Sequence, residues 1–199
     1  MVVILYSPIV NRKNGIVFTW GESCPFSRYY SARFELDGIE FQTIAHYLSV
    51  AKLNMFHLGN LPPSKLVDVL EQENELEAIG STRMLGVYDI VNAKSGFAAE
   101  KLVNRLPRFK MDRWLNQLPE LLTKANSAKF KHHPEIHETL VSFKDYVFAE
   151  SEQFCFDTGI GMKANHPDAN QPWCWRGENL HGKCLQKLAL DYSLDISSP

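Results

Sequence analysis

The alternation of apolar and polar residues predicts short strands at the beginning of the chain. Apolar, β-like runs cover Val2–Tyr6, Ile16–Trp20, Ala32–Leu36 and Ile39–Phe41. Asp37-Gly38, between the last two runs, is a two-residue turn of the kind that joins the strands of a hairpin. We therefore expect an antiparallel β element near the N-terminus of the fold.

Helical periodicity replaces this alternation after Thr43. Apolar side chains recur at every third or fourth position from Ile44 to Met55, and Thr43 is a suitable N-cap for the helix. Similar patterns predict further helices over 64–79, 83–92, 97–105, 110–130, 134–143 and 179–192, with Pro107, Pro119 and Pro134 at starts or kinks. The sequence therefore indicates an α+β fold that is predominantly helical.

A long irregular segment follows the last β-like run, Tyr146–Glu150. Residues 158–167 have neither helical nor strand periodicity, and ordered loops of this kind are usually functional. Their Gly159-Ile160-Gly161 would bring main-chain N–H groups close to a phosphate, although a lone G-x-G is a weak signal. Beyond the loop, Trp173 and Trp175 either pack in the core or stack on a base, and the residues alone leave both interpretations open.

Composition narrows the class of protein. The 199 residues are 45% hydrophobic and 12% aromatic, which excludes an intrinsically disordered chain. The formal charge of -2 excludes a protein that holds duplex nucleic acid or anionic membrane through its overall charge. The four cysteines form no C-x-x-C pair, which favours reduced thiols. Without a signal-like leader or a stretch of ~20 apolar residues, we expect a cytoplasmic protein with no membrane partner, built as one domain over residues 1–199.

Lys52 is the most informative ionisable residue, because it lies inside a strongly apolar helical segment. Partial burial would lower its pKa and provide the neutral amine that a Schiff-base nucleophile requires. The simpler interpretation of the residue alone is a lysine whose stem covers apolar surface at the helix margin. His46 has the same ambiguity, since a packed, hydrogen-bonded histidine is common in a core.

Two other features suggest ligands less strongly. Residues 101–132 hold eight Lys and Arg against two acidic residues, which suits either a phosphate-bearing substrate or a solvated helix face. His133 and His137 have an i, i+4 spacing suited to a metal, but they lack the acidic residue of H-E-x-x-H. We expect no metal site.

Short motifs follow one another in a fixed order between residues 18 and 192. They are Phe26-Ser27-Arg28-Tyr29, Asp37-Gly38, Thr43-Ile44-Ala45-His46-Tyr47, Lys52, Trp114, Ala128-Lys129-Phe130 with Pro134, Gly159-Ile160-Gly161, and Trp175-Arg176-Gly177-Glu178-Asn179-Leu180-His181-Gly182. This ordered set resembles the NADAR family, which includes N-glycosidases of riboflavin intermediates and glycohydrolases that remove ADP-ribose from guanine in nucleic acid. Any one motif is short, but the order makes the set fairly specific.

The resemblance implies an N-glycosidase of NADAR-like fold that needs no cofactor. It would hydrolyse the bond between ribose C1 and an exocyclic base amine in an ADP-ribosyl or phosphoribosyl adduct, and ADP-ribosylated guanine in nucleic acid is one such substrate. Lys52 stands where the family's lysine stands and would form a Schiff base with C1. No protein partner is indicated. The residues implied to bind substrate are Ser27, Arg28, His46, Gly159, Gly161, Trp175, Gly177, Glu178 and Asn179.

The chain also departs from the family pattern. Ala45 replaces a glutamate and Arg28 an asparagine, while Cys155 and Thr158 fall where an acidic residue and a tryptophan are expected. Positions i and i+7 share a helix face, so a glutamate at position 45 would face the same cavity as Lys52.

Another residue must therefore supply the carboxylate that moves protons. We predict Asp157 for this role, with Glu150 and Glu152 as alternatives. The competing hypothesis is a catalytically silent module that binds ADP-ribose or a related nucleotide in a defence or regulatory assembly.

Overall fold

The computed structural model describes residues 9–11, 14–57, 85–104 and 111–195. Within these residues the fold is α+β and predominantly helical, as the sequence predicts. The helices are α1 (Ile44–His57), α3 (Val87–Val91), α4 (Gly96–Val103), α5 (Met111–His132), α6 (Pro134–Ser142) and α7 (Leu180–Asp195). The strands are β1 (Ile9–Asn11), β2 (Ile16–Thr19), β3 (Phe34–Leu36), β4 (Ile39–Phe41) and β5 (Val147–Glu150). The predicted strand over 2–6 and helix over 64–79 lie outside the described residues.

The strands form two small sheets. β3 and β4 make the predicted hairpin, and both turn residues, Asp37 and Gly38, have positive φ angles of 57° and 81°, as a tight hairpin turn requires. The other sheet has the order β1-β2-β5, with β1 antiparallel and β5 parallel to β2. Its parallel register pairs Ile16 with Val147 and Thr19 with Glu150, so the end of β5 is held beside the beginning of the chain.

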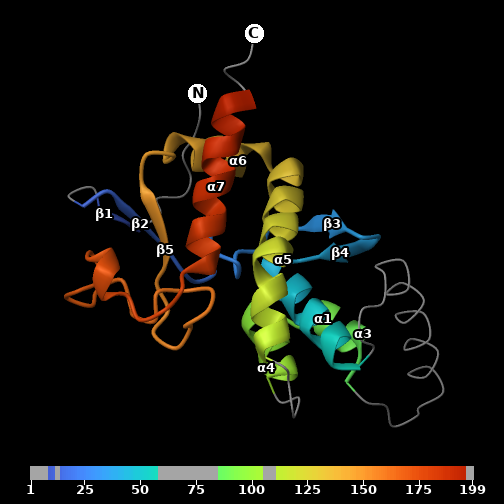
Figure 1. The fold of residues 1–199 in the computed structure, drawn as a ribbon. Coiled ribbons are helices and arrows are strands. Elements are labelled where there is room, and N and C mark those ends of the chain that lie inside the picture. The colour runs from blue at the N-terminus through green and yellow to red at the C-terminus, as the bar shows by residue number, and fades with distance from the viewer. Residues whose placement is uncertain (1–8, 12–13, 58–84, 105–110, 196–199) are drawn as a thin grey trace, which may run out of the picture.

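Two long helices organise the core. α5 and α7 run side by side, with the three-stranded sheet beside α7 and the β3–β4 hairpin on the other side of α5 (Figure 1). α1 packs against both α4 and α5. Fully buried side chains from these elements, including Phe34, Phe41, Leu118 and Phe130, form the main hydrophobic core. Each such side chain contributes about 1.5–3 kcal/mol through removal of apolar surface from water.

The start of α1 is fixed by its N-cap. The Thr43 hydroxyl oxygen accepts a 3.3 Å hydrogen bond from the His46 main-chain N–H, which confirms the predicted cap. His46 Nε2 donates a 3.0 Å hydrogen bond to the Ala93 carbonyl. Its Nδ1 therefore accepts the 2.8 Å hydrogen bond from the Thr43 hydroxyl, since a neutral imidazole carries one proton. His46 thus joins the first turn of α1 to the segment before α4.

The approach of α4 to α1 depends on Gly96. A Cβ atom at this position would lie 2.9 Å from the Ala45 Cβ and 2.8 Å from the Thr43 hydroxyl oxygen, closer than real contacts allow. Ser95 caps α4 by accepting a 3.2 Å hydrogen bond from the Ala98 N–H. The close approach of Gly96 to the first turn of α1 places the side chains of α4 beside those of α1.

The structure describes Pro119, Pro134 and the predicted loop, whereas Pro107 lies outside the described residues. Pro119 lies inside α5 on its exposed side, and Pro134 is the first residue of α6. The segment from 151 to 171 contains no helix or strand, and a short 3₁₀ turn, Pro172–Cys174, follows it. In the part of the chain that the structure describes, we find no helix with the length and apolarity needed to span a bilayer.

Candidate functional site

A cavity of about 420 Å³ lies between α1, α4, the start of α5 and the loop after β5. Its walls combine aromatic rings with ionisable side chains. The residues that line it are Trp20, Arg28, Tyr29, Leu48, Ser49, Lys52, Phe97, Glu100, Val103, Asn104, Trp114, Glu152, Phe154, Cys155, Asp157 and Thr158.

Lys52 brings an amine to this cavity from α1. Its Nζ donates a 3.0 Å hydrogen bond to Asn104 Oδ1 and lies 5.8 Å from the centre of the Trp114 ring. Burial lowers the pKa of Lys52 from its ordinary value, although the negative charges of Glu100 and Asp157 act in the opposite direction. A lowered pKa increases the fraction of neutral amine at physiological pH.

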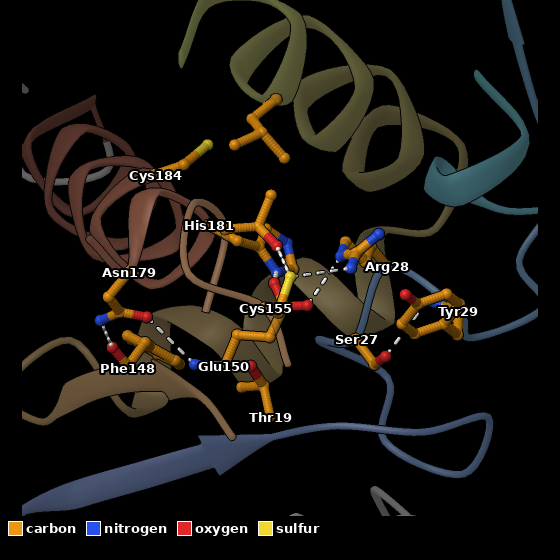
Figure 2. Close-up of polar contacts among 12 residues, drawn as sticks. Thr19, Ser27, Arg28, Tyr29, Phe148, Glu150, Cys155, Asn179, His181 and Cys184 are labelled. Atoms are coloured by element: carbon orange, nitrogen blue, oxygen red, sulfur yellow. Dashed lines mark hydrogen bonds and ion pairs between the residues drawn. The ribbon is translucent and has the colours of Figure 1, made fainter. Parts of the chain in front are cut away.

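A buried network of charges lies beside the cavity (Figure 2). Arg28 Nε donates a 2.7 Å hydrogen bond to Glu150 Oε1, and the two side chains are 4% and 2% exposed. His181 Nδ1 donates a 3.1 Å hydrogen bond to the other oxygen of Glu150. Burial alone would raise the pKa of Glu150, but Arg28 and the hydrogen bond from His181 outweigh it and lower the pKa to about 2. Glu150 is therefore ionised and fully committed to these partners.

Glu100 links this network to the open part of the cavity. One of its carboxylate oxygens pairs with Arg28 Nη1, and the other accepts a 2.6 Å hydrogen bond from the Tyr29 hydroxyl. The Arg28 guanidinium also lies 4.4 Å from the centre of the Tyr29 ring. Burial alone would lower the pKa of Arg28, but Glu100 and Glu150 raise it well above its ordinary value. Arg28 is thus a permanent cation that two carboxylates neutralise.

The loop after β5 supplies a thiol, a hydroxyl and a carboxylate. Cys155 Sγ lies 2.8 Å from the Thr158 hydroxyl and 3.4 Å from Arg28 Nη2. Burial raises the pKa of Cys155 to about 12, so this thiol is protonated at neutral pH and lacks the thiolate of a nucleophilic cysteine. Asp157 Oδ1 accepts a 2.7 Å hydrogen bond from the Thr158 N–H, which fixes its carboxylate at the cavity wall.

Lys129 holds the turn that carries Arg28. This lysine is completely buried in α5, and its Nζ donates hydrogen bonds of 2.7 Å to the Pro25 carbonyl and 3.2 Å to the Ser27 carbonyl. Burial lowers the pKa of Lys129 to about 7. Its hydrogen-bond acceptors are main-chain carbonyls of the turn before Arg28, so this lysine positions Arg28 through the backbone. Lys129 itself does not line the cavity.

Comparison with known proteins identifies the family. The sequence profile of the NADAR domain matches residues 16–189, which is most of the chain. The chain belongs to the NADAR family. The structure is similar to the NMR structure of the E. coli protein YbiA, with a TM-score of 0.62 and 18% identity over 94% of this chain and 89% of that chain. At this identity the likeness shows the fold alone. No curated protein sequence matches the chain.

The structure brings together only part of the site predicted from the NADAR motifs. Lys52, Arg28 and Asp157 all line the cavity. Ala45 is fully buried and does not line it, although Leu48, Ser49 and Lys52 on the same helix do. The expectation that position 45 faces the cavity is therefore wrong for this chain, because Gly96 of α4 covers the first turn of α1.

Two other residues expected to bind substrate hold the turns around the site. Ser27 is buried, and its hydroxyl oxygen accepts a 3.1 Å hydrogen bond from the Tyr29 N–H. His46 is fully buried at the start of α1, and burial lowers its pKa. Neither residue lines the cavity. Their contacts explain why the family motif has polar residues here without requiring contact with a ligand.

The glycines of the NADAR motifs lie in a close crossing of two segments. The Ile160 N–H donates a 2.9 Å hydrogen bond to the Glu150 carbonyl, and the Gly161 N–H donates one of 3.1 Å to the Cys155 carbonyl. A Cβ atom at Gly177 would overlap the Gly159 carbonyl oxygen. The N–H groups of Ile160 and Gly161 are therefore occupied within the protein, so they do not form an open phosphate nest.

Asn179 fastens this crossing to β5. Its Oδ1 accepts a 3.1 Å hydrogen bond from the Glu150 N–H, and its Nδ2 donates one of 2.8 Å to the Phe148 carbonyl (Figure 2). Trp175 Nε1 donates a 2.9 Å hydrogen bond to the Ala169 carbonyl. These contacts fix the loop on which Asp157 lies. They also give Trp175 a packing role, which was one of its two interpretations from the sequence.

Other predicted residues lie away from the cavity. Glu178 is exposed and lies 3.7 Å from Lys183. His133 Nε2 donates a 2.8 Å hydrogen bond to the Arg33 carbonyl, whereas His137 stacks on the Phe130 ring. The two histidines of the i, i+4 pair therefore have separate partners. That Glu178 contacts substrate stays a prediction.

Sequence reasoning missed several residues of the cavity. The most important of them is Glu100, because it contacts Arg28 and Tyr29 and its charge acts on Lys52. Nothing in the sequence distinguishes it from an ordinary polar residue of an amphipathic helix. The aromatic residues Trp20, Phe97 and Phe154 of the lining were missed as well, although Phe154 directly follows the polar residues 151–153, which is a usable signal.

Proposed function

We propose that this protein is an N-glycosidase that cleaves the bond between ribose C1 and an exocyclic base amine in an ADP-ribosyl or phosphoribosyl adduct. Lys52 would act through a Schiff base. The observation that carries the proposal is a half-buried lysine amine of lowered pKa that lines a cavity together with carboxylates. Membership of a glycosidase-related family supports the same reaction class.

The reaction needs only water as a second reactant. The ribose ring opens when the bond between C1 and the ring oxygen breaks, the exocyclic nitrogen forms a C1=N bond, and the ring oxygen takes up a proton. The neutral Lys52 amine then adds to C1, both protons of Nζ move to the base nitrogen, and the base leaves as a neutral amine while the C1=Nζ bond forms. Water adds to C1 of the resulting Schiff base, and breaking the C1–Nζ bond releases the sugar and restores the lysine.

Asp157 is our candidate for the carboxylate that moves these protons. It lines the cavity, its charge acts on Lys52, and its orientation is fixed by the hydrogen bond from the Thr158 N–H. Glu150 is completely buried, and Glu100 is tied to Arg28 and Tyr29. Glu152 also lines the cavity and is the alternative. General acid–base assistance of this kind is worth about 10²–10⁴-fold in rate.

Trapping the Schiff base tests the proposal. We expect borohydride reduction during incubation with an ADP-ribosylated guanine oligonucleotide, or with the aminated ribosyl-pyrimidine phosphates of riboflavin synthesis, to leave a mass adduct on Lys52. Lys52→Arg keeps the charge and should abolish both the adduct and hydrolysis. Lys101→Arg is the matched control, because Lys101 is exposed on α4. Absence of an adduct with every substrate, or full activity of Lys52→Arg, would overturn the proposal.

A nucleotide-binding module without catalytic activity is the second candidate. It is favoured by Ala45, which stands where the family pattern has a glutamate, so the first turn of α1 supplies no carboxylate. In that case ADP-ribose would bind in a calorimetric titration while no adduct is hydrolysed, and clear turnover of any adduct would exclude this second function.

We also propose a cytoplasmic location, because all four cysteines are free thiols.

A further inference from the structure

Phe154 presents an aromatic ring at the cavity that no packing requirement explains. The side chain is 78% exposed, although it lines the cavity. The Phe154 N–H donates a 3.2 Å hydrogen bond to Glu152 Oε1. A single exposed apolar side chain is ordinary. Here the ring also belongs to the lining of a cavity that contains the candidate nucleophile, so its position has chemical meaning.

The cavity has further aromatic walls. Trp20, Tyr29 and Phe97 form a cluster in which Tyr29 and Phe97 are stacked at 3.8 Å, and Trp20 meets them edge-on at 5.0 Å and 5.5 Å. All three rings line the cavity, as does Trp114. Flat, polarisable walls of this kind suit a planar heteroaromatic group, because bases bind by stacking on aromatic faces.

The charges of the cavity do not suit a phosphate group. Its lining includes three carboxylates, those of Glu100, Glu152 and Asp157, against the cations Arg28 and Lys52. Arg28 is neutralised by Glu100 and by the buried Glu150. A phosphate in this cavity would therefore meet an excess of negative charge.

The carboxylates have a different use if a base occupies the cavity. The amino group of a base donates hydrogen bonds, and carboxylate oxygens are acceptors only. Of the three carboxylates, those of Glu152 and Asp157 lie on the same loop as Phe154. One loop thus presents a stacking face together with acceptors for the base edge.

We propose that the cavity binds the base of the adduct, that this base stacks on Phe154, and that the phosphates of the substrate lie outside the cavity. This inference rests on the proposed function, since it names the part of the substrate that the same site binds. Stacking of a base on an aromatic side chain changes affinity by about 5- to 150-fold. Phe154 is therefore a residue that selects a planar leaving group.

Equilibrium binding of nucleosides tests the inference. Adenosine, guanosine and cytidine, whose bases carry an exocyclic amine, are titrated calorimetrically against the wild-type protein and three variants. We expect Phe154→Ala to weaken binding by about 5- to 150-fold and Phe154→Trp to retain it. Phe156→Ala is the matched control, because Phe156 is 55% exposed on the same loop but does not line the cavity, and it should bind like wild type. Inorganic phosphate should not displace the nucleoside.

Four results would overturn the inference. Three of them are failure of all three nucleosides to bind the wild-type protein, equal affinity of Phe154→Ala and wild type, and displacement of the nucleoside by inorganic phosphate. The fourth is an equal loss of affinity in Phe154→Ala and Phe156→Ala, since this would indicate a general change of the loop. No bond is cleaved in these titrations, so their outcome is separate from the trapping experiment. Nucleoside binding without an adduct on Lys52 would refute the proposed reaction and leave the base site standing.

Discussion

Replacing Arg28 with methionine is expected to destabilise the protein strongly at neutral pH and less at acidic pH. The substitution leaves the Glu150 carboxylate buried with only His181 as a side-chain partner. Removing one partner of a buried ion pair typically costs 3–5 kcal/mol, because the remaining charge is uncompensated. For a protein of this size, this corresponds to a fall in Tm of roughly 6–20 °C.

The pH dependence follows from the pKa of Glu150. Its partners lower this pKa from 4.5 to about 2. At about 1.4 kcal/mol for each pH unit, the shift stabilises the folded protein by about 3 kcal/mol. This contribution is complete above pH 4.5 and is lost as the pH falls toward 2, with about 1.4 kcal/mol gone by about pH 3.5. In Arg28→Met burial dominates and raises the pKa of Glu150, so the same acidification favours the folded variant.

Urea unfolding of wild type and Arg28→Met between about pH 7 and pH 3.5 measures this difference. The gap in unfolding free energy should shrink as the pH falls. Arg33→Met is the matched control, because the Arg33 and Glu40 side chains are 69% and 60% exposed, and such pairs contribute less than about 1 kcal/mol. A gap for Arg28→Met that is the same at every pH would refute the role assigned to the Glu150 charge.

Three further predictions follow from the same structure. Lys129 has its pKa lowered by burial to about 7, so wild type should gain stability relative to Lys129→Met as the pH rises from 7 to about 10, and urea unfolding that shows a constant difference would contradict this. Ala45→Glu places a carboxylate against Gly96 and should lower the Tm without raising activity; a faster enzyme with an unchanged melting curve would show that position 45 reaches the cavity. Asp157→Asn should reduce kcat on a confirmed substrate by about 10²–10⁴-fold with little change in Tm, and an unchanged kcat would transfer the proton-moving role to Glu152.

Local signals in the sequence predicted most of the elements but not their assembly. Thr43 identifies the start of α1, Asp37-Gly38 identifies the hairpin, and Pro134 identifies the start of α6, since each acts within a few residues of its own position. The parallel pairing of β2 with β5 has no such signal. The two strands have four residues each and lie far apart in the chain, and β5 also packs against α7, so their pairing belongs to the tertiary structure.

Some residues of the candidate site could be predicted from local sequence signals, and others could not. Lys52 could be identified because a lysine in an apolar helix is unusual, and this remains visible without a structure. Glu100 could not, because its importance depends on the close approach of α4 to α1 at Gly96. Gly159-Ile160-Gly161 suggested a phosphate nest, yet the N–H groups of Ile160 and Gly161 are used to fold the loop on itself. Whether an amide faces a ligand or a carbonyl is decided by tertiary contacts.

The buried pair of Arg28 and Glu150 also constrains when the protein can fold during its synthesis. The two residues are 122 positions apart in the chain, and β5, which carries Glu150, pairs with a strand near the N-terminus. A nascent chain grows from its N-terminus at about 5–20 residues per second, so several seconds pass between the synthesis of Arg28 and that of Glu150. During that interval Glu100, which is synthesised earlier, is available to pair with Arg28, but the completely buried carboxylate of Glu150 is missing. Cavity assembly is therefore a late event, and ribosome-bound chains that end before Glu150 should remain sensitive to proteases around Arg28.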